Sequence, residues 1–338
     1  MARRTERTTA LPRPRPRAVS GQQRRIAGIA WSEEHLRLGI LAGAAALLVL
    51  VLGMLGYGWY DDHVLTPNKA VLTVGSEQVK LNYYADRLYQ FVQSNQTSGD
   101  NVSLLEQQLL TKLEDEALTI ELAKERGINL SDDEITKQIA SELGVPVGGP
   151  GSSFDTLYRQ RLKTTKMSDA NYRRMAEATL ANTRLLDQMK NEVGDTGEMV
   201  SIRTVVSNSK DAANAVAARI KGGEDLGSVA QTDSTDLQSK QNDGLMLPEP
   251  PALLPDAIKT AIEGKQAGTE LFGPIQVQNN WWVFRIDSRN PTAQYSDAQK
   301  AQLAQIRLDE AIKAKRAATT IKRNLSPSDV VWAEKHSG

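Results

Sequence analysis

The chain has 338 residues, with 41 basic and 41 acidic side chains, so its formal net charge is zero. It contains no cysteine, which excludes disulfides, thiolate metal sites and a lipid-modified cysteine anchor. Its histidines are His35, His63 and His336, so the long middle of the chain offers no imidazole for acid–base or metal chemistry. We therefore expect a fold held together by apolar burial, with no metal and no cofactor.

Residues 38–60 form an apolar segment of 23 residues without a charged side chain. As a helix it would reach roughly 35 Å, enough to cross a hydrocarbon core of ~30 Å. Tyr57, Trp59 and Tyr60 gather at its far end, where aromatic rings favour the membrane interface. A cleaved signal peptide is the main alternative, but the segment is too long and begins too far from the N-terminus. The sequence predicts a retained transmembrane helix in contact with lipid.

The charges around this segment predict its orientation. Residues 1–37 hold nine arginines and three glutamates, whereas Asp61 and Asp62 follow the segment. The positive-inside rule then predicts a single-pass protein of the cell membrane with a cytoplasmic N-terminus and an extracytoplasmic bulk. The basic, proline-rich tail is expected to be disordered and to act as a topology signal, so no nucleic acid is expected as a partner. Gly39 and Gly43 have a helix-packing spacing, which leaves a dimer open.

Residues 66–195 are expected to be mainly helical after a short strand and turn over 71–79. The clearest helix covers 103–126, where Leu105, Leu109, Leu113 and Ala117 recur at four-residue spacing. A capping box, Ser131 to Glu134, predicts the start of the next helix. The remaining expected helices cover about 82–94 and 154–191, the latter as one helix or two. Their apolar faces need partners, so we expect a bundle.

The composition changes near residue 195, and residues 197–290 are expected to form a small α+β domain. The expected strands cover 199–206 and 281–286, the expected helices 210–221 and 255–263, and the segment 238–255 is expected to be loop. Ser296 and Asp297 then cap a long helix that ends near Arg323, within the segment 294–325. Residues 326–338 are expected to be a tail.

Two regions resemble known domains. Val74 to Val79 with Tyr84, followed by Leu109 to Ile139, resemble the N-terminal chaperone domain of SurA, PrsA and PpiD-type foldases. Residues 199–289 resemble a parvulin, or PpiC-type, peptidyl-prolyl isomerase domain, with these marks: Ala213, Ile220, Gly223, Asp225, Leu226, Ala230, Ser234, Asp236, Asp243, Gly273, Pro274 and Trp281 to Ile286. The resemblance implies an α+β chain with a single N-terminal transmembrane helix. Its all-helical chaperone domain would be completed by the C-terminal helix, with a small parvulin-like α+β domain inserted between.

The resemblance also implies where a site would lie, and this sequence departs from the family there. Isomerases of this family usually carry two histidines on facing strands, and these positions fall on Thr204 and Trp282. The nearby acidic position falls on Asp236, so these three are the catalytic candidates. The resemblance implies substrate-binding positions at Asp243, Met246, Leu254, Ala257, Phe272 and Trp281, where Ala257 replaces an aromatic wall.

Isomerisation itself needs neither a nucleophile nor a proton. The enzyme has only to bind the twisted amide better than the planar forms, against a barrier of ~18–20 kcal/mol. Thr204 would still offer a hydroxyl, but the loss of both histidines predicts weak or lost activity. Capping of turns is the simpler role for Asp236 and Asp243. Strand alternation predicts that Trp281 and Trp282 face opposite sides.

The resulting hypothesis is a membrane-anchored extracytoplasmic foldase that binds unfolded or proline-containing exported polypeptides. The expected binding surface is an apolar groove between the helical and parvulin-like domains. Two alternatives stay open at this stage. The chain could be an active prolyl isomerase with an atypical site, or a non-catalytic interaction subunit of an envelope assembly.

Overall fold

The computed structural model describes residues 25–26, 29–30, 33–95 and 102–336. The chain divides into two compact units, Met1–Pro67 and Asn68–Gly338. The expected disordered tail, residues 1–37, lies mostly outside the described residues. Within it the structure describes only two short strands, β1 (Arg25–Ile26) and β2 (Ile29–Ala30), and the beginning of the next helix.

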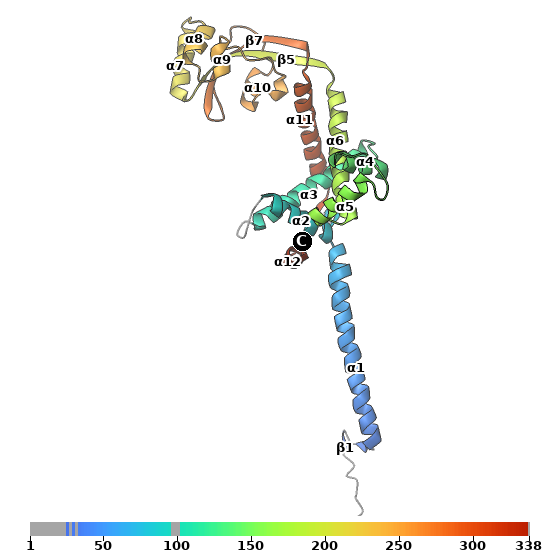
Figure 1. Ribbon diagram of the computed structural model, residues 1–338. Helices are drawn as coiled ribbons and strands as arrows, with labels where there is room; N and C mark the ends of the chain where they lie inside the picture. Colours follow the sequence, from blue (N-terminus) through green and yellow to red (C-terminus); the bar gives the residue numbers. More distant parts are fainter. Residues whose placement is uncertain (1–24, 27–28, 31–32, 96–101, 337–338) are drawn as a thin grey trace, which may run out of the picture. The chain divides into compact units, whose positions relative to one another are not determined.

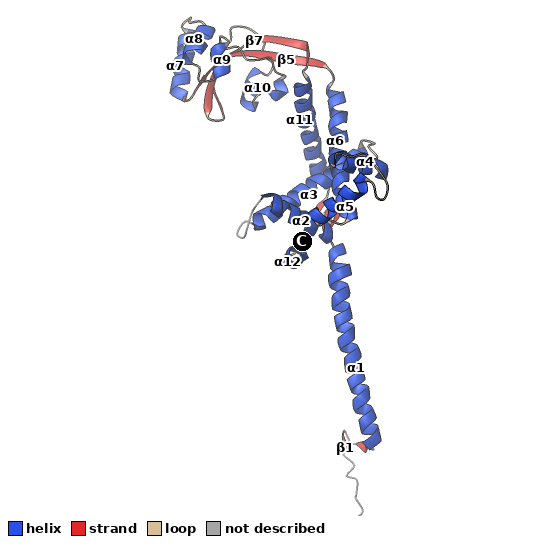
Figure 2. Ribbon diagram, viewed as in Figure 1, coloured by secondary structure: helices blue, strands red, loops and turns tan. Residues whose placement is uncertain are grey.

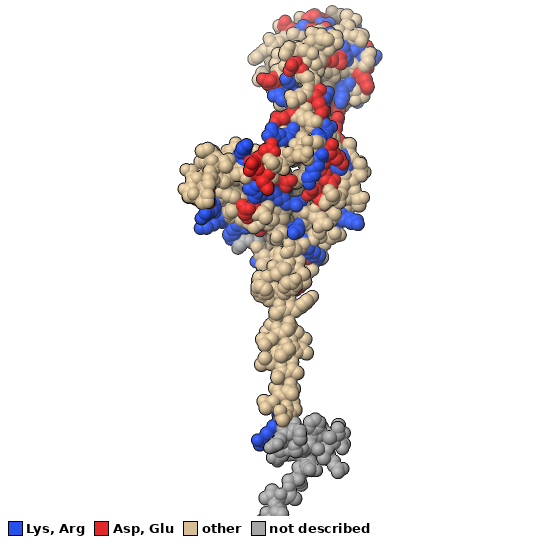
Figure 3. All heavy atoms as spheres, turned by 90° about the vertical axis from the view of Figure 1, so that its right-hand side faces the viewer, with Lys and Arg blue, Asp and Glu red and all other residues tan. Residues whose placement is uncertain are grey.

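The first unit is dominated by α1 (Glu33–Tyr60), which contains the whole apolar segment. A π-helical turn, η1 (Asp61–Leu65), and a 3₁₀ turn, η2 (Thr66–Asn68), follow it. Figure 3 shows α1 as a surface without charged side chains until its N-terminal end. None of its most apolar window is buried within the structure. Because a core helix of a soluble domain would be buried, α1 is a candidate membrane span.

Five helices form most of the first half of the second unit (Figures 1 and 2). They are α2 (Leu81–Asn95), α3 (Val102–Glu125), α4 (Asp132–Glu142), α5 (Ser153–Thr165) and α6 (Asp169–Val193). The predicted capping box at α4 is confirmed, since Ser131 Oγ accepts from the Glu134 N–H and the Glu134 carboxylate accepts from the Ser131 N–H. Lys166, in the left-handed region, separates α5 from α6. Residues 154–191 therefore form two helices.

The helical part also contains a three-stranded sheet in the order β4-β3-β8. β3 (Ala70–Val74) and β4 (Glu77–Lys80) form the hairpin expected over residues 71–79. β8 (Ile321–Arg323) comes from the far end of the chain and pairs antiparallel with β3. The long C-terminal helix, α11 (Asp297–Ala318), accordingly ends before the predicted Arg323. Thr319, Thr320 and Ile321 are β-branched and favour the extended backbone that β8 needs.

Residues 326–338 were expected to be a tail, but the structure has a helix there, α12 (Pro327–His336). Pro327 begins it, as proline often does at the first helical position. Ala333 is fully buried in the same apolar core as α2, α3 and the β3–β4 hairpin. Trp332 also packs against this core. The apolar residues of α12, Val330 to Ala333, form one continuous run without a helical period, which explains why the sequence did not reveal the helix.

The predicted packing of the C-terminal helix on the helical domain is confirmed. Leu308 and Ala304 of α11 are buried against α3 and α6, where they meet Ile120, Leu185 and Met189. Figure 1 shows α11 and α6 running side by side. Segments from both ends of unit Asn68–Gly338 thus share one core.

The parvulin-like part is built on an antiparallel sheet in the order β5-β7-β6. Its strands are β5 (Thr196–Ser207), β6 (Phe272–Val277) and β7 (Asn280–Gln294). On one face, α7 (Lys210–Lys221) and α8 (Leu226–Asp233) pack on Val205 and Val283. On the other face, α10 (Asp256–Ile262) packs on Ile202 and Phe284. The segment expected to be loop also holds α9 (Leu237–Gln241) and η3 (Pro251–Leu253).

Candidate functional site

The two positions of the family histidines fall on one face of the parvulin-like sheet. Thr204 lies opposite Phe284, and Trp282 lies opposite Val206 on the paired strands β5 and β7. Directly paired residues of antiparallel strands share a face, so Thr204 and Trp282 both lie on the side covered by α10. Trp281 is paired with Ser207 and lies on the other face, as strand alternation predicts.

A cavity of about 310 Å³ opens on the α10 side of the sheet. Three residues predicted from the sequence line it: Met246, Leu254 and Trp282. The other lining residues are Val200, Ile202, Gln238, Leu247, Glu249, Leu253, Pro255, Ile258 and Gln302. Gln302 belongs to α11, so the cavity has one wall from outside the parvulin-like sheet. The cavity lies in the parvulin-like part and α11 borders it, while the groove expected between the helical and parvulin-like domains stays a prediction.

One wall of the cavity is a short segment, residues 244–249, laid along β5. Met246 donates its backbone N–H to Ile202 O at 2.9 Å, and Glu249 and Val200 exchange backbone hydrogen bonds of 2.8 and 2.9 Å. Gly244 begins the segment with φ +81°, and a Cβ there would lie 3.0 Å from Thr204 O. Glycine is therefore needed where this wall leaves the α9 turn. The backbone pairing fixes the positions of Met246 and Glu249 along β5.

Thr204 does not present its hydroxyl to the cavity. The residue is fully buried, and its Oγ1 donates to Val283 O at 3.3 Å. Its backbone N–H donates to Gly244 O at 2.8 Å. Both donors are thus satisfied within the sheet and its neighbouring wall, so Thr204 supports the site without contacting an occupant.

The two acidic candidates have local structural contacts, and neither lines the cavity. Asp236 is the N-cap of α9, where its carboxylate accepts from the Ser239 N–H at 2.7 Å. Asp243 has φ +53°, its carboxylate accepts from Gln231, and its carbonyl accepts from Arg203 at 2.6 Å. These contacts match the capping roles considered from the sequence.

The remaining sequence candidates do not line the cavity. Ala257 is exposed on α10, and the next residue, Ile258, lines the cavity in its place. Phe272 stacks on Phe284 at 5.3 Å in the core below. Trp281 packs on the α7 side, with Lys210 Nζ 5.4 Å from the ring centroid.

Several apolar lining residues were not predicted, although the sequence contains the signal for them. Ile202 and Val200 stand two and four positions before Thr204, so strand alternation alone puts them on the same face. Gln302 carries no such signal, because only the packing of α11 brings it to the cavity. Exposed apolar surface adjoins the site: Leu247 is 70% exposed while lining the cavity, and Leu237 of α9 is 71% exposed.

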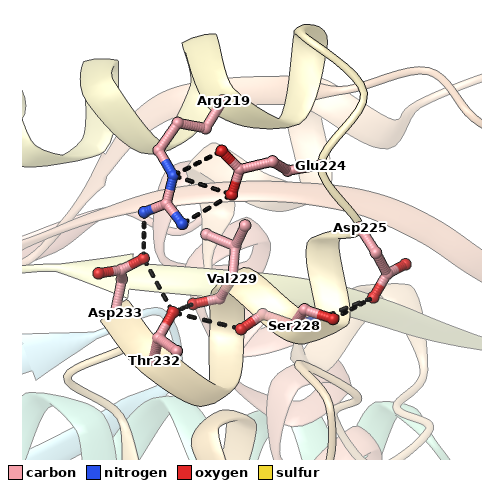
Figure 4. A network of polar contacts seen from close by, with 7 residues as sticks. All are labelled: Arg219, Glu224, Asp225, Ser228, Val229, Thr232 and Asp233. Atoms are coloured by element: carbon pink, nitrogen blue, oxygen red, sulfur yellow. Dashed lines mark hydrogen bonds and ion pairs between the residues drawn. The ribbon is translucent and has the colours of Figure 1, made fainter.

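A polar network on the other side of this domain is structural. Arg219 of α7 donates to Glu224 at 2.7 and 3.0 Å and also pairs with Asp233 of α8 (Figure 4). The hydrogen bonds from Arg219 hold the pKa of Glu224 below its usual range. Asp225 caps α8 by accepting from the Ser228 N–H at 2.9 Å. The network joins two neighbouring helices, and none of these residues lines the 310 Å³ cavity.

The cavity is suited to binding an apolar segment. Its polar lining side chains are Gln238, Glu249 and Gln302, and the rest of the lining is aliphatic, proline, methionine and tryptophan. Among the residues that the structure describes, no group of three or more histidines, aspartates or glutamates is placed to hold a metal ion. The residues that line the cavity include no histidine that could act as an acid or base.

Comparison with known proteins agrees with this arrangement. A SurA-like N-terminal domain matches residues 29–186, and a PPIC-type PPIase domain matches residues 152–302. Chaperone SurA of Yersinia pestis is 28% identical over 250 residues, which cover 64% of this chain and 56% of that protein. Chaperone SurA of Yersinia pseudotuberculosis matches with the same identity and coverage. The chain thus spans about half the length of these curated relatives.

Solved structures of the same kind are also similar. The peptidyl-prolyl isomerase PrsA from Bacillus anthracis matches with a TM-score of 0.42 and 14% identity, covering 62% of this chain and 96% of that one. PrsA from Bacillus cereus gives the same TM-score and identity, covering 80% and 99%. The chain is thus similar to chaperone SurA, and it matches a SurA-like N-terminal domain followed by a PPIC-type PPIase domain.

Proposed function

We propose that this protein is a membrane-anchored extracytoplasmic foldase whose main activity is to bind unfolded exported polypeptides. The observation that carries the proposal is the apolar cavity on the α10 face, with Trp282 in its lining at a family histidine position. Leu247, which lines the cavity, is 70% exposed and extends this apolar surface into solvent. Exposed apolar surface beside a cavity is typical of sites for extended or unfolded segments.

The same site is the reason to expect that isomerase activity is weak or lost. Thr204 is fully buried and its hydroxyl is engaged with Val283 O, so it cannot hydrogen-bond a substrate amide without breaking that contact. Trp282 contributes an indole ring, whose N–H can only donate a hydrogen bond, where a histidine would contribute a ring that can also accept one and take up a proton. Differential binding of the twisted amide would then lack both histidines of the family site, and each ~1.4 kcal/mol of lost transition-state binding is a tenfold loss of rate.

The anchor is supported by α1 and its flanks. The helix is long and apolar enough to cross a membrane, and it is unburied. Nine arginines precede its apolar segment and Asp61 and Asp62 follow it, which favours a cytoplasmic N-terminus and an extracytoplasmic unit Asn68–Gly338.

The proposal is tested by two assays on the full-length chain in lipid nanodiscs. One measures cis–trans isomerisation of a proline peptide, and the other measures suppression of aggregation of a chemically unfolded client protein. We expect isomerisation near the uncatalysed rate together with clear suppression of aggregation. Fast isomerisation would identify an active isomerase with an atypical site. Absence of both activities would favour a non-catalytic interaction subunit.

A further inference from the structure

The cavity on the α10 face carries a single kind of charge. Its lining contains two glutamines, Gln238 and Gln302, and one ionisable residue, Glu249. Glu249 therefore gives an otherwise apolar and neutral site a negative side. This asymmetry bears on which polypeptide segments the site selects.

Glu249 is held in place from two directions. Its backbone N–H and C=O both bond to Val200 of β5, at 2.9 and 2.8 Å. Its Oε2 accepts from Gln299 Nε2 of α11 at 3.1 Å. Gln299 is itself fixed, because its Oε1 accepts from the Ser296 N–H at 3.0 Å in the capping box of α11. The carboxylate is thus positioned before any ligand arrives.

The carboxylate of Glu249 has unused acceptor capacity. Across the described parts of the chain, no lysine or arginine lies within 4.0 Å of it, whereas Glu114 and Glu121 each form ion pairs. A carboxylate has about four lone-pair sites, and the amide of Gln299 occupies one of them. Glu249 is only partly exposed, so a cation brought to it by a ligand would be partly screened from water.

We propose that the site selects segments in which an apolar side chain stands next to lysine or arginine. The apolar side chain would enter between Met246, Leu254 and Trp282, and the neighbouring cation would pair with Glu249. This inference rests on the proposed function, since it names the class of segment bound by the same cavity. Exposed ion pairs contribute about 0.2–1 kcal/mol, so the expected preference for a cation is about 1.4- to fivefold in Kd.

The test uses fluorescent decapeptides that share a Leu-Pro centre and differ only in the residue before leucine, which is lysine, glutamine or glutamate. Binding to the full-length chain in zwitterionic nanodiscs is measured by fluorescence anisotropy, because neutral lipid does not attract the peptide charge. We expect Kd to rise in the order lysine, glutamine, glutamate. In Glu249→Gln the three values should converge. Glu263→Gln, an exposed change at the end of α10 away from the lining, is the matched control and should keep the order.

The outcomes separate the two proposals. Equal Kd values for the three peptides on the parent chain, or an order that survives Glu249→Gln, would overturn the charge selection while leaving apolar binding intact. No binding of any peptide would instead count against the proposed function. Retention of the order in Glu263→Gln together with its loss in Glu249→Gln would support this inference.

Discussion

Lys69 and Asp329 join the two ends of the unit Asn68–Gly338, although 260 positions separate them in the sequence. The Lys69 ammonium donates to the two oxygens of the Asp329 carboxylate at 2.6 and 2.8 Å. Asp329 is 4% exposed and also accepts from the Ser326 N–H and hydroxyl, at 2.8 and 2.6 Å. The carboxylate of Asp329 therefore accepts hydrogen bonds from Ser326, just before α12, and also pairs α12 with Lys69, the residue that precedes β3.

We predict that Asp329→Asn lowers the free energy of unfolding by about 1–3 kcal/mol. The change removes a charged acceptor from a buried position and leaves the Lys69 and Ser326 donors poorly paired. The measurement is the urea midpoint of the full-length chain in nanodiscs. Glu310→Gln, an exposed change on α11, is the control and should stay within about 0.5 kcal/mol. Equal midpoints for Asp329→Asn and the parent would show that the contact contributes nothing.

The sequence predicted those parts of the fold that depend on local signals. Capping boxes begin α4 at Ser131 and α11 at Ser296, and apolar residues at four-residue spacing mark α3 before Gly127. Each of these signals involves only residues close together in the sequence. β8 and α12 depend on partners more than 200 positions away. Ile321 and Ala333 become core residues only because β3 and α2 are already there, and no window of sequence contains that information.

A second prediction concerns acid. Burial works to raise the pKa of Glu121, but hydrogen bonds from Ser76 and the pairing with Lys315 outweigh it and hold this pKa below its usual range. Asp329 behaves likewise, with burial opposed by Lys69 and Ser326. A carboxyl group whose folded pKa is lowered stabilises the fold above its unfolded pKa, near about pH 4, and this contribution is lost as the pH falls through the folded value.

The expected result is a urea midpoint that is steady from pH 7 to about 5 and falls steeply below about pH 4. The double variant Glu121→Gln, Asp329→Asn should start lower at pH 7 and show a shallower fall, because two of the titrating contacts are gone. The pH series is followed by circular dichroism of the full-length chain. A parallel fall in parent and variant would assign the acid sensitivity to other groups.

The third prediction tests the packing of α11. Leu308 is fully buried between α3 and α6, and Leu308→Ala should cost about 2–5 kcal/mol by leaving a cavity there. Hydrogen exchange should show lost protection in peptides from α3 and α6 and retained protection in β5 and β7. Arg307→Ala, at the neighbouring exposed position, is the control. Loss of protection spread evenly over all these elements would contradict a local role for Leu308.

The candidate site was predictable only in part, again for a physical reason. Trp282, Met246 and Leu254 line the cavity. The resemblance to the family predicted these three, because their positions in the sequence match its substrate site. Thr204 lies on the same face of the sheet, but it is fully buried and its hydroxyl donates to Val283 O. Gln302 and Gln299 come from α11, and only the assembled chain brings them to Glu249.

The fourth prediction concerns topology. The excess of arginine in residues 1–37 should hold the N-terminus in the cytoplasm while unit Asn68–Gly338 is exported. Protease added to spheroplasts should digest the chain beyond about Asp61 and spare an epitope placed at the N-terminus. Detergent permeabilisation is the control and should expose both ends. An N-terminal epitope digested in intact spheroplasts would reverse the orientation.

The last prediction separates binding from catalysis. Trp282→Ala removes a large apolar wall of the cavity and should weaken client binding about tenfold or more, as loss of a buried aromatic anchor commonly does. Asp236→Ala removes an N-cap from α9, so it should lower stability by about 0.5–2 kcal/mol and leave client affinity near that of the parent. Both variants are compared with the parent in the peptide-anisotropy and proline-isomerisation assays. The isomerisation rate should be near background in all three, because Thr204 is engaged within the sheet and the cavity lining contains no histidine. A fast parent rate that Asp236→Ala abolishes would instead make Asp236 a catalytic residue and this protein an isomerase with an unusual site.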